Sequence, residues 1–242
     1  MKCNEQNVLQ IKNFSIGYNK ILIFEHININ IPQGVRCAII GLNGSGKTTL
    51  LKGILELEEK QSGEILFFGK QLNNISDLIA YVPQIKSVDW SFPITVENVV
   101  RMGTYSMNRF CSYESTNTTD NKIHYALEKM NLIKKKNSHI NNLSGGEKQR
   151  VFIARSIAQT PSLYILDEPL TGLDILSEQI ITQLFKDISK ENKTIIAVHH
   201  DLYTLYDYFN WVIIVNKGIT YSGKLDRNIV EPYIKEAFFR YS

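Results

Sequence analysis

The residues best suited to chemistry form one glycine-rich segment, Gly41-Leu42-Asn43-Gly44-Ser45-Gly46-Lys47-Thr48. Its spacing matches G-x-x-x-x-G-K-[ST], a loop whose backbone N–H groups bind phosphate oxygens. Lys47 is expected to reach the β- and γ-phosphates, and the Thr48 hydroxyl to bind Mg²⁺. The alternative, an ordinary glycine turn before a helix, leaves the full match unexplained. The segment therefore predicts a site for a nucleoside triphosphate.

A strand before this segment and a helix after it must position the loop. Cys37-Ala38-Ile39-Ile40 predicts a short buried strand, and Thr49-Leu50-Leu51 with Ile54 and Leu55 predicts a helix with an apolar face. Glycines let the loop turn its N–H groups inward, and the helix N-terminus adds partial positive charge. The predicted nucleotide ligands are Gly41, Asn43, Gly44, Ser45, Gly46, Lys47, Thr48 and Thr49.

Two carboxylates end a second apolar strand, in Tyr164-Ile165-Leu166-Asp167-Glu168. The carboxyl ends of parallel strands are where open α/β sheets bind ligands. Asp167 is predicted to serve Mg²⁺, and Glu168 to orient or deprotonate the water that attacks the γ-phosphate. An acidic pair that only opens a turn before Pro169 is the alternative for this segment taken alone.

A second helix N-terminus with two glycines follows Leu143, in Ser144-Gly145-Gly146-Glu147. Ser144 and Glu147 have the S-x-x-E spacing of a capping box, which by itself only starts a helix. The same geometry makes an anion site. Since one nucleotide does not need two phosphate sites in one chain, the second is expected to close over a nucleotide held by a partner chain.

In motif order and over nearly its whole length, the chain resembles the ATP-binding subunits of ABC (ATP-binding cassette) transporters. The resemblance implies that Tyr18 stacks on adenine, where the alternative is a core aromatic residue. It implies that Gln84, in Tyr81-Val82-Pro83-Gln84, senses Mg²⁺ and the attacking water, where the alternative is a loop amide. It also implies that Thr171-Gly172-Leu173-Asp174 is a dimer-contact loop, with Asp174 facing the other subunit.

The histidine that contacts the γ-phosphate is, by this resemblance, His200, which precedes Asp201. His199 stands where the family more often has a small polar residue, and it is the alternative for this role. Glu147 replaces the glutamine common at the end of the signature sequence and still supplies the cap.

The resemblance further implies a homodimer with two composite sites, using ATP and Mg²⁺. One subunit would supply Lys47, Thr48, Gln84, Asp167, Glu168 and His200, and the other Ser144, Gly145 and Gly146. The implied partners are membrane permease subunits and, indirectly, an extracytoplasmic solute-binding protein, with no nucleic acid. The implied location is cytoplasmic, on the inner face of the cell membrane.

The segment after Gln84, which contains Val88-Asp89-Trp90-Ser91-Phe92-Pro93, resembles ATPases of manganese, zinc and iron importers. Trp90 and Phe92 form either an exposed anchor for the permease or part of the helical lobe's own core. ATPases that import haem, siderophores or vitamin B12 are the main alternative. A soluble translation factor with two cassettes, a DNA-repair ATPase with long heptad segments and a module without turnover fit the chain less well.

Composition excludes several other classes of protein. The chain has 242 residues with 27 Lys plus Arg against 24 Asp plus Glu, and a net charge of +3 is too small to argue for nucleic-acid binding. It has no apolar run of membrane-spanning length and no signal peptide pattern. The three cysteines, Cys3, Cys37 and Cys111, are expected to be free thiols in a reducing cytosol, and the five histidines predict no metal cluster.

The order of patterns predicts an α/β fold, a P-loop NTPase core of the ABC ATPase type with an antiparallel β subdomain and a helical insertion. Residues 8–31 alternate as strands of the antiparallel sheet, and helical spacing dominates residues 94–158. Within that insertion, Cys111 to Lys122 is polar and predicts an exposed loop. We expect one domain, 1–242, with its core at about 1–85 and 160–242 and the helical subdomain at about 86–159.

Overall fold

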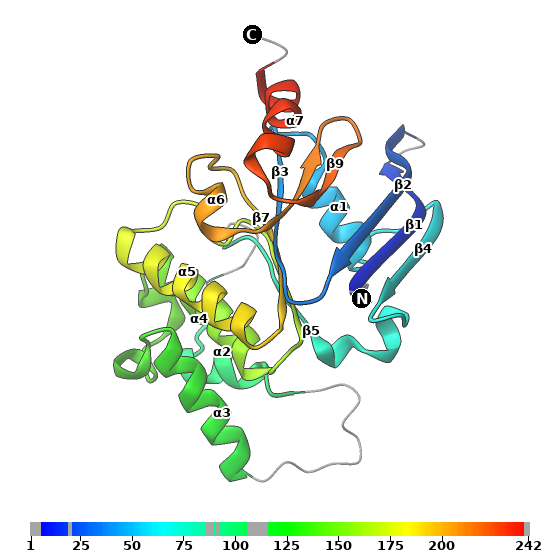
Figure 1. The fold of residues 1–242 in the computed structure, drawn as a ribbon. Coiled ribbons are helices and arrows are strands. Elements are labelled where there is room, and N and C mark those ends of the chain that lie inside the picture. The colour runs from blue at the N-terminus through cyan, green and yellow to red at the C-terminus, as the bar shows by residue number, and fades with distance from the viewer. Residues whose placement is uncertain (1–5, 19–20, 86–89, 91, 106–115, 240–242) are drawn as a thin grey trace. The chain divides into compact units, whose positions relative to one another are not determined.

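The computed structural model describes residues 6–18, 21–85, 90, 92–105 and 116–239 (Figure 1). The chain divides into two compact units, one from residues 1–76 and 188–242 and the other from 77–187. The first unit holds β1 (Asn7–Tyr18), β2 (Ile21–Pro32), β3 (Arg36–Gly41), α1 (Lys47–Ile54), β4 (Ser62–Phe67), β7 (Thr194–Val198), α6 (Leu205–Tyr208), β8 (Trp211–Val215), β9 (Ile219–Lys224) and α7 (Arg227–Phe239). The second holds β5 (Ile79–Val82), α2 (Val96–Met102), α3 (Thr116–Lys129), α4 (Gly145–Ala158), β6 (Leu163–Leu166) and most of α5 (Ile175–Lys190).

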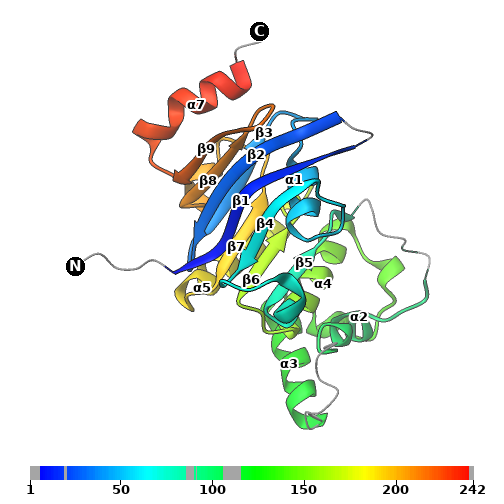
Figure 2. The same cartoon turned by 90° about the vertical axis from the view of Figure 1, so that its right-hand side faces the viewer.

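The antiparallel sheet predicted for the N-terminal part is confirmed. Strands β2, β1 and β4 lie side by side in that order, with both pairs antiparallel (Figure 2). In β2 the side chains of Ile27, Ile29 and Ile31 are buried while Asn28 and Asn30 are exposed. Alternation of apolar and polar residues thus set the buried face, because successive side chains of a strand point to opposite sides.

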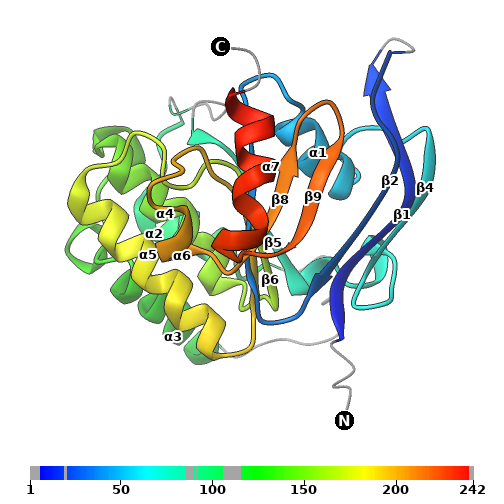
Figure 3. The ribbon, with the colours of Figure 1, turned by 45° about the horizontal axis from the view of Figure 1, so that its top comes forward.

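Buried strands of the first unit support the predicted phosphate loop. β3 pairs in parallel with β7 on one side and β8 on the other, and β9 adds an antiparallel strand beside β8. α7 lies against β8 and β9 (Figure 3), and buries Val230, Ile234 and Ala237. Because the ends of β3 and β7 lie side by side, the residues that follow these two strands share one edge of the sheet.

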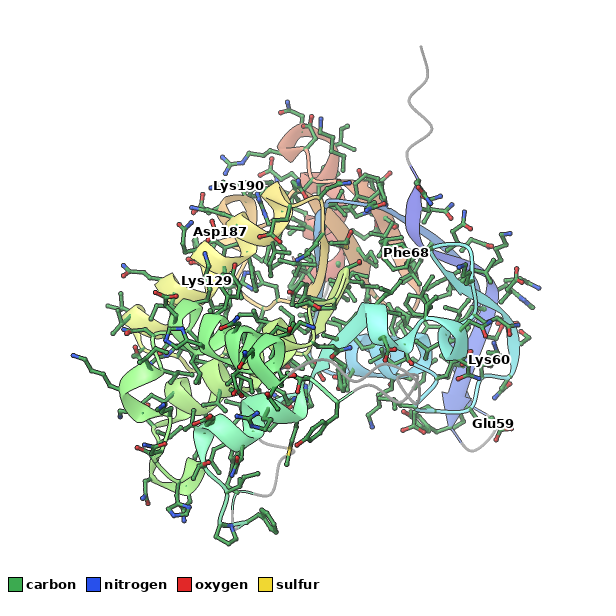
Figure 4. All side chains as sticks on the ribbon, turned by 90° about the horizontal axis from the view of Figure 1, so that it is seen from below. Glu59, Lys60, Phe68, Lys129, Asp187 and Lys190 are labelled. Atoms are coloured by element: carbon green, nitrogen blue, oxygen red, sulfur yellow. The ribbon has the colours of Figure 1, made fainter. Side chains whose placement is uncertain are left out.

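The second unit combines the parallel pair β5–β6 with the helices predicted for residues 94–158. α4 packs against α2 and α3, and the Arg150 guanidinium ties α4 to the end of α3 by donating to the Met130 carbonyl at 2.7 Å. On the outside, Lys129 of α3 and Asp187 of α5 lie 3.4 Å apart, Nζ to Oδ2 (Figure 4). The predicted mixture of a parallel α/β core, an antiparallel sheet and a helical region is confirmed.

The prediction of an exposed loop from Cys111 to Lys122 is wrong for the second half of that segment. Residues 116–122 form the first half of α3, and residues 111–115 lie outside the described residues. Thr and Asn have modest helix propensity, but α3 buries Ile123, Ala126 and Leu127 against its neighbours. Tertiary packing of that apolar face therefore stabilises a helix that the polar composition concealed.

The two units divide at residues 76/77 and 187/188, so β5 and β6 belong with the helices. The second unit, 77–187, is larger than the helical subdomain expected at about 86–159. The expected subdomain boundaries stay a prediction. Among the described residues, no helix is both long and apolar enough to cross a membrane. Cys37 is a buried free thiol, and burial raises its pKa; the other two cysteines lie outside the described residues.

Candidate nucleotide site

The loop between β3 and α1 has a backbone that depends on glycine. Gly44 has a φ of 78° and Gly46 a φ of 104°, values that other residues rarely adopt. A Cβ on Gly46 would lie 2.8 Å from Ile23 Cγ2 and 2.9 Å from Phe24 Cε2, whereas one on Gly44 would meet nothing within 4 Å. Gly46 is therefore required for conformation and for packing, and Gly44 for conformation alone.

The N-terminus of α1 has no capping side chain. Gly46 is its N-cap residue and makes no side-chain capping bond, so no side chain of the cap covers the N–H groups of the first turn. The Ser45 hydroxyl is buried and, in the described part of the chain, has no hydrogen-bonding partner. A ligand with several oxygens would satisfy such donors. The loop thus fits a polyphosphate.

The Lys47 ammonium lies inside the curve of this loop. Its side chain is buried, and Nζ donates to the carbonyls of Gly41 at 2.9 Å and Leu42 at 2.8 Å. Both acceptors are uncharged and belong to the loop itself, so the lysine holds the loop closed around a positive charge. Thr48 follows at the exposed first turn of α1, where its hydroxyl oxygen is a suitable donor for Mg²⁺.

The predicted carboxylates and Gln84 lie together in the second unit. Gln84 Nε2 donates to Glu168 Oε2 at 2.7 Å, although the residues are 84 positions apart. Asp167 is buried, and its N–H donates to the Val82 carbonyl, which extends the β5–β6 pairing to this residue. Burial, together with the negative charge of Asp167, raises the pKa of the Tyr81 phenol. The second unit thus gathers two carboxylates and an amide, a donor set suited to Mg²⁺ and water.

Glu168 has a left-handed backbone with a φ of 51°. That conformation is uncommon for a residue other than glycine, and here it turns the chain sharply just after β6. The turn that produces it places the Glu168 side chain beside Gln84, while Asp167 keeps its place at the end of β6. The two neighbouring carboxylates therefore have different environments, as their two predicted roles require.

The two adjacent histidines after β7 differ in exposure. His199 is buried, its ring lies 5.1 Å from the Phe209 ring, and its Nε2 is 3.0 Å from the Thr204 hydroxyl. His200 is exposed. Because the His199 ring already packs against Phe209 and its Nε2 pairs with Thr204 inside the protein, the geometry favours exposed His200 over His199 for that predicted role.

Tyr18 ends β1 and its side chain is 40% exposed. That exposure argues against the core aromatic alternative and leaves a ring face available for stacking. Stacking on adenine stays a prediction.

The predicted capping box at the start of α4 is confirmed. The Glu147 N–H donates to the Ser144 hydroxyl at 3.2 Å, and the Ser144 N–H donates to the Glu147 carboxylate at 3.0 Å. Burial alone would raise the pKa of Glu147, but hydrogen bonds from Lys135 and from the Ser144 N–H together lower it. Ser144 and Gly145 are exposed at this helix tip, as a site that closes over an external anion requires.

Gly146 touches the cap of a second helix. Asp174 caps α5, because its carboxylate accepts from the Ser177 N–H at 2.8 Å and from the Ser177 hydroxyl at 2.9 Å. A Cβ on Gly146 would lie 2.5 Å from Asp174 Oδ2 and 2.6 Å from Ser177 Oγ, whereas one on Gly145 would meet nothing within 4 Å. The two glycines therefore differ: Gly145 is exposed at the helix tip, and Gly146 packs closely against the Asp174 cap.

Replacing Gly146 by Ala should destabilise the protein by about 1–3 kcal/mol, the usual cost of overpacking, because the new methyl group displaces the Asp174 cap. Gly145→Ala is the matched control and should leave the free energy of unfolding unchanged or slightly higher, since helical alanine is favoured over glycine. Urea unfolding of both variants measures the difference. Equal stability of the two variants would contradict this contact.

Trp90 and Phe92 lie in different environments. The Trp90 ring packs edge-on against Phe152 at 5.3 Å between centroids, with Lys148 Nζ 5.0 Å above it. Phe92 is 66% exposed. The sequence left open whether these rings are exposed or part of a core. Trp90 packs within the second unit, whereas Phe92 is an exposed aromatic side chain.

Ser177 and Thr204 are two supporting residues that sequence reasoning did not identify. The D-x-x-S spacing of Asp174 and Ser177 is that of a helix cap and carried a usable signal. No local sequence pattern predicts the pairing of His199 with Thr204, because this pairing depends on the turn between β7 and α6.

Residues 24–171 match the family model described as ABC transporter. The chain is 36% identical to the zinc transport system ATP-binding protein TroB of Treponema pallidum, over 95% of this chain and 86% of that protein. It is 37% identical to the manganese transport system ATP-binding protein MntB of Bacillus subtilis, over 86% of this chain and 83% of that protein. Among solved structures, it is similar to cbiO1 of Clostridium perfringens, part of the ABC transporter complex cbiONQ, with a TM-score of 0.79 and 25% identity over 97% of this chain and 96% of that one.

Proposed function

We propose that this chain, because it belongs to the ABC transporter family, is the ATP-hydrolysing subunit of an importer for a transition-metal ion, namely manganese, zinc or iron. The metal ion is the cargo and would pass through a partner membrane permease. The observation that best supports the hydrolysis part is the hydrogen bond between Gln84 and Glu168, because the proposed general base would then act beside an amide that can order water.

The residues have the following roles in hydrolysis. Lys47 and the loop N–H groups would bind the β- and γ-phosphates, and Tyr18 would stack on adenine. Thr48, Asp167 and Gln84 would hold Mg²⁺, which when bound neutralises charge on the phosphate oxygens. Glu168 would accept a proton from the attacking water, while His200 would contact the γ-phosphate.

The active form is, in this proposal, a dimer of two copies. Each copy would present its α4 tip, Ser144 to Gly146, to the nucleotide bound by the other copy. The exposure of Ser144 and Gly145 and the positive end of the α4 dipole support this role. Because the triphosphate would then bind two surfaces at once, ATP favours the closed dimer over the open one. Loss of the γ-phosphate on hydrolysis would weaken that preference.

The metal cargo is supported by two sequence similarities, one over most of the chain and one in a single segment. The relatives TroB and MntB are named for zinc and manganese transport. The segment that follows Gln84 resembles the same group of ATPases in its own residues, which include Trp90, Phe92 and Pro93. Importers of haem, siderophores or vitamin B12 stay the alternative.

The permease contact is proposed to use Phe92. An exposed aromatic side chain next to Pro93 is the kind of anchor that dominates protein interfaces, whereas Trp90 is engaged by Phe152 and Lys148. We further propose that the whole chain forms one ABC domain that lies at the inner face of the cell membrane.

Deleting the gene for this chain should lower cellular manganese, zinc or iron under limitation for that metal, as measured by elemental mass spectrometry. The wild-type gene should restore the metal content. Phe92→Ala should restore it poorly, although the purified variant hydrolyses ATP normally. Leu57→Ala is the matched control, because Leu57 is also an exposed apolar residue, at 58%, but belongs to the first unit.

Unchanged cellular contents of all three metals would contradict the proposal that the cargo is a metal ion, and would leave the ATPase assignment intact. A lower haem or cobalamin content in the same cells would support the alternative cargo. Full restoration by Phe92→Ala would exclude Phe92 as the permease anchor.

A further inference from the structure

The turn that carries His200 is closed by a chain of hydrogen bonds from His199 to Asp201. The Thr204 hydroxyl lies 3.0 Å from His199 Nε2 and 2.9 Å from Asp201 Oδ2. The other oxygen of Asp201 accepts from the Tyr203 N–H at 2.9 Å. Thr204 thus links the residue before His200 to the residue after it.

The hydrogen bonds of this turn indicate which nitrogen of the His199 ring carries a proton. An ionised carboxylate can only accept, so the single hydroxyl proton of Thr204 must go to Asp201. The Thr204 oxygen then accepts, which requires that His199 Nε2 carries a proton and donates. His199 is therefore held as the Nε2–H form by its partner.

His199 is also anchored to the strand that leads into the phosphate loop. Its backbone N–H donates to the Ile39 carbonyl of β3 at 3.0 Å, which extends the β3–β7 ladder by one residue. The ring is buried between this anchor and the aromatic residues Tyr208 and Phe209, at 6.3 and 5.1 Å between centroids. A small polar side chain at this position would reach neither the Thr204 hydroxyl nor these rings.

We infer that His199 is a positioning residue, which fixes the direction of His200 through the Thr204 hydroxyl and Asp201. This inference rests on the proposed function, in which His200 contacts the γ-phosphate of ATP. His199 itself touches no nucleotide. Its effect is to hold the His200 backbone on both sides, so that the exposed imidazole is aimed before ATP binds.

The first test uses the chain without nucleotide. Two-dimensional ¹H–¹⁵N spectra of histidine-labelled protein should show His199 with its proton on Nε2. Thr204→Val, which removes the hydroxyl, should change that signal, and Thr204→Ser should keep it. His199→Phe retains an aromatic ring without the donor, and it should speed amide exchange at Tyr203 by ~10-fold as the turn loosens. A proton on Nδ1 alone, or unchanged exchange at Tyr203, would overturn the inference.

The second test measures hydrolysis. His199→Phe should lower kcat by ~10-fold while the KM for ATP changes by less than about twofold. His199→Gln should recover most of the loss, because its amide can donate from a similar position. In a His200→Ala background, His199→Phe should cause no further loss, since both act through one side chain. An equal loss in both backgrounds would make His199 merely structural and overturn the inference.

The two proposals fail in different ways. If His200→Ala leaves kcat unchanged, the γ-phosphate contact in the proposed function is wrong. The proton on His199 and the exchange at Tyr203 then decide the positioning inference without reference to ATP.

Discussion

Replacing Glu168 by Gln should stop ATP hydrolysis while ATP still binds. The amide cannot take the proton of the attacking water, and loss of a general base typically lowers kcat by ~10² to 10⁴-fold. The hydrogen bond from Gln84 can persist, because the amide oxygen of the new residue still accepts at the position of Glu168 Oε2. With hydrolysis blocked, the ATP-bound dimer should accumulate.

Phosphate release and light scattering in the presence of ATP and Mg²⁺ measure the two effects. Glu128→Gln makes the same chemical change at an exposed position of α3 and should leave both unchanged. Hydrolysis at the wild-type rate by the Glu168 variant would remove Glu168 as the base. If hydrolysis is blocked but no dimer accumulates, the proposal that two copies share the bound nucleotide would be contradicted.

Replacing Lys47 by Ala should weaken ATP binding by at least ~100-fold. Charge-assisted hydrogen bonds contribute about 1.5–3 kcal/mol each, and each 1.4 kcal/mol corresponds to about tenfold in Kd. The substitution also removes both bonds that hold the loop closed, to the carbonyls of Gly41 and Leu42. The preformed phosphate site would therefore be lost along with the charge.

Titration with a fluorescent ATP analogue measures this change, and circular dichroism checks that the fold persists. Lys52→Ala is the matched control, because Lys52 lies on the same helix but is partly exposed and pairs with Glu58 at 3.3 Å. Lys52→Ala should bind ATP as the wild type does. Unchanged affinity in a folded Lys47→Ala protein would refute the phosphate-loop assignment.

Features that depend on neighbouring residues were predictable from the sequence. The strand–loop–helix arrangement around residues 41–48, the capping box of Ser144 and Glu147, and the alternation of Ile27, Ile29 and Ile31 all appear as expected. Each is decided by residue types and spacing within one short segment, so its physical cause is contained in the pattern itself. The family resemblance, which rests on several such patterns in a fixed order, was confirmed for the same reason.

Only the tertiary structure decided which residue of a similar pair is packed inside and which is exposed. Sequence alone could not assign Trp90 to packing and Phe92 to the surface, nor separate buried His199 from exposed His200. The helix at residues 116–122 was concealed by its polar composition. Each outcome depends on partners distant in the chain, such as Phe152 for Trp90 and Ile39 for His199, and the hydrogen bond of Gln84 spans 84 residues. Local propensity does not predict such contacts, because they form only when folding closes long loops and buries apolar faces against one another.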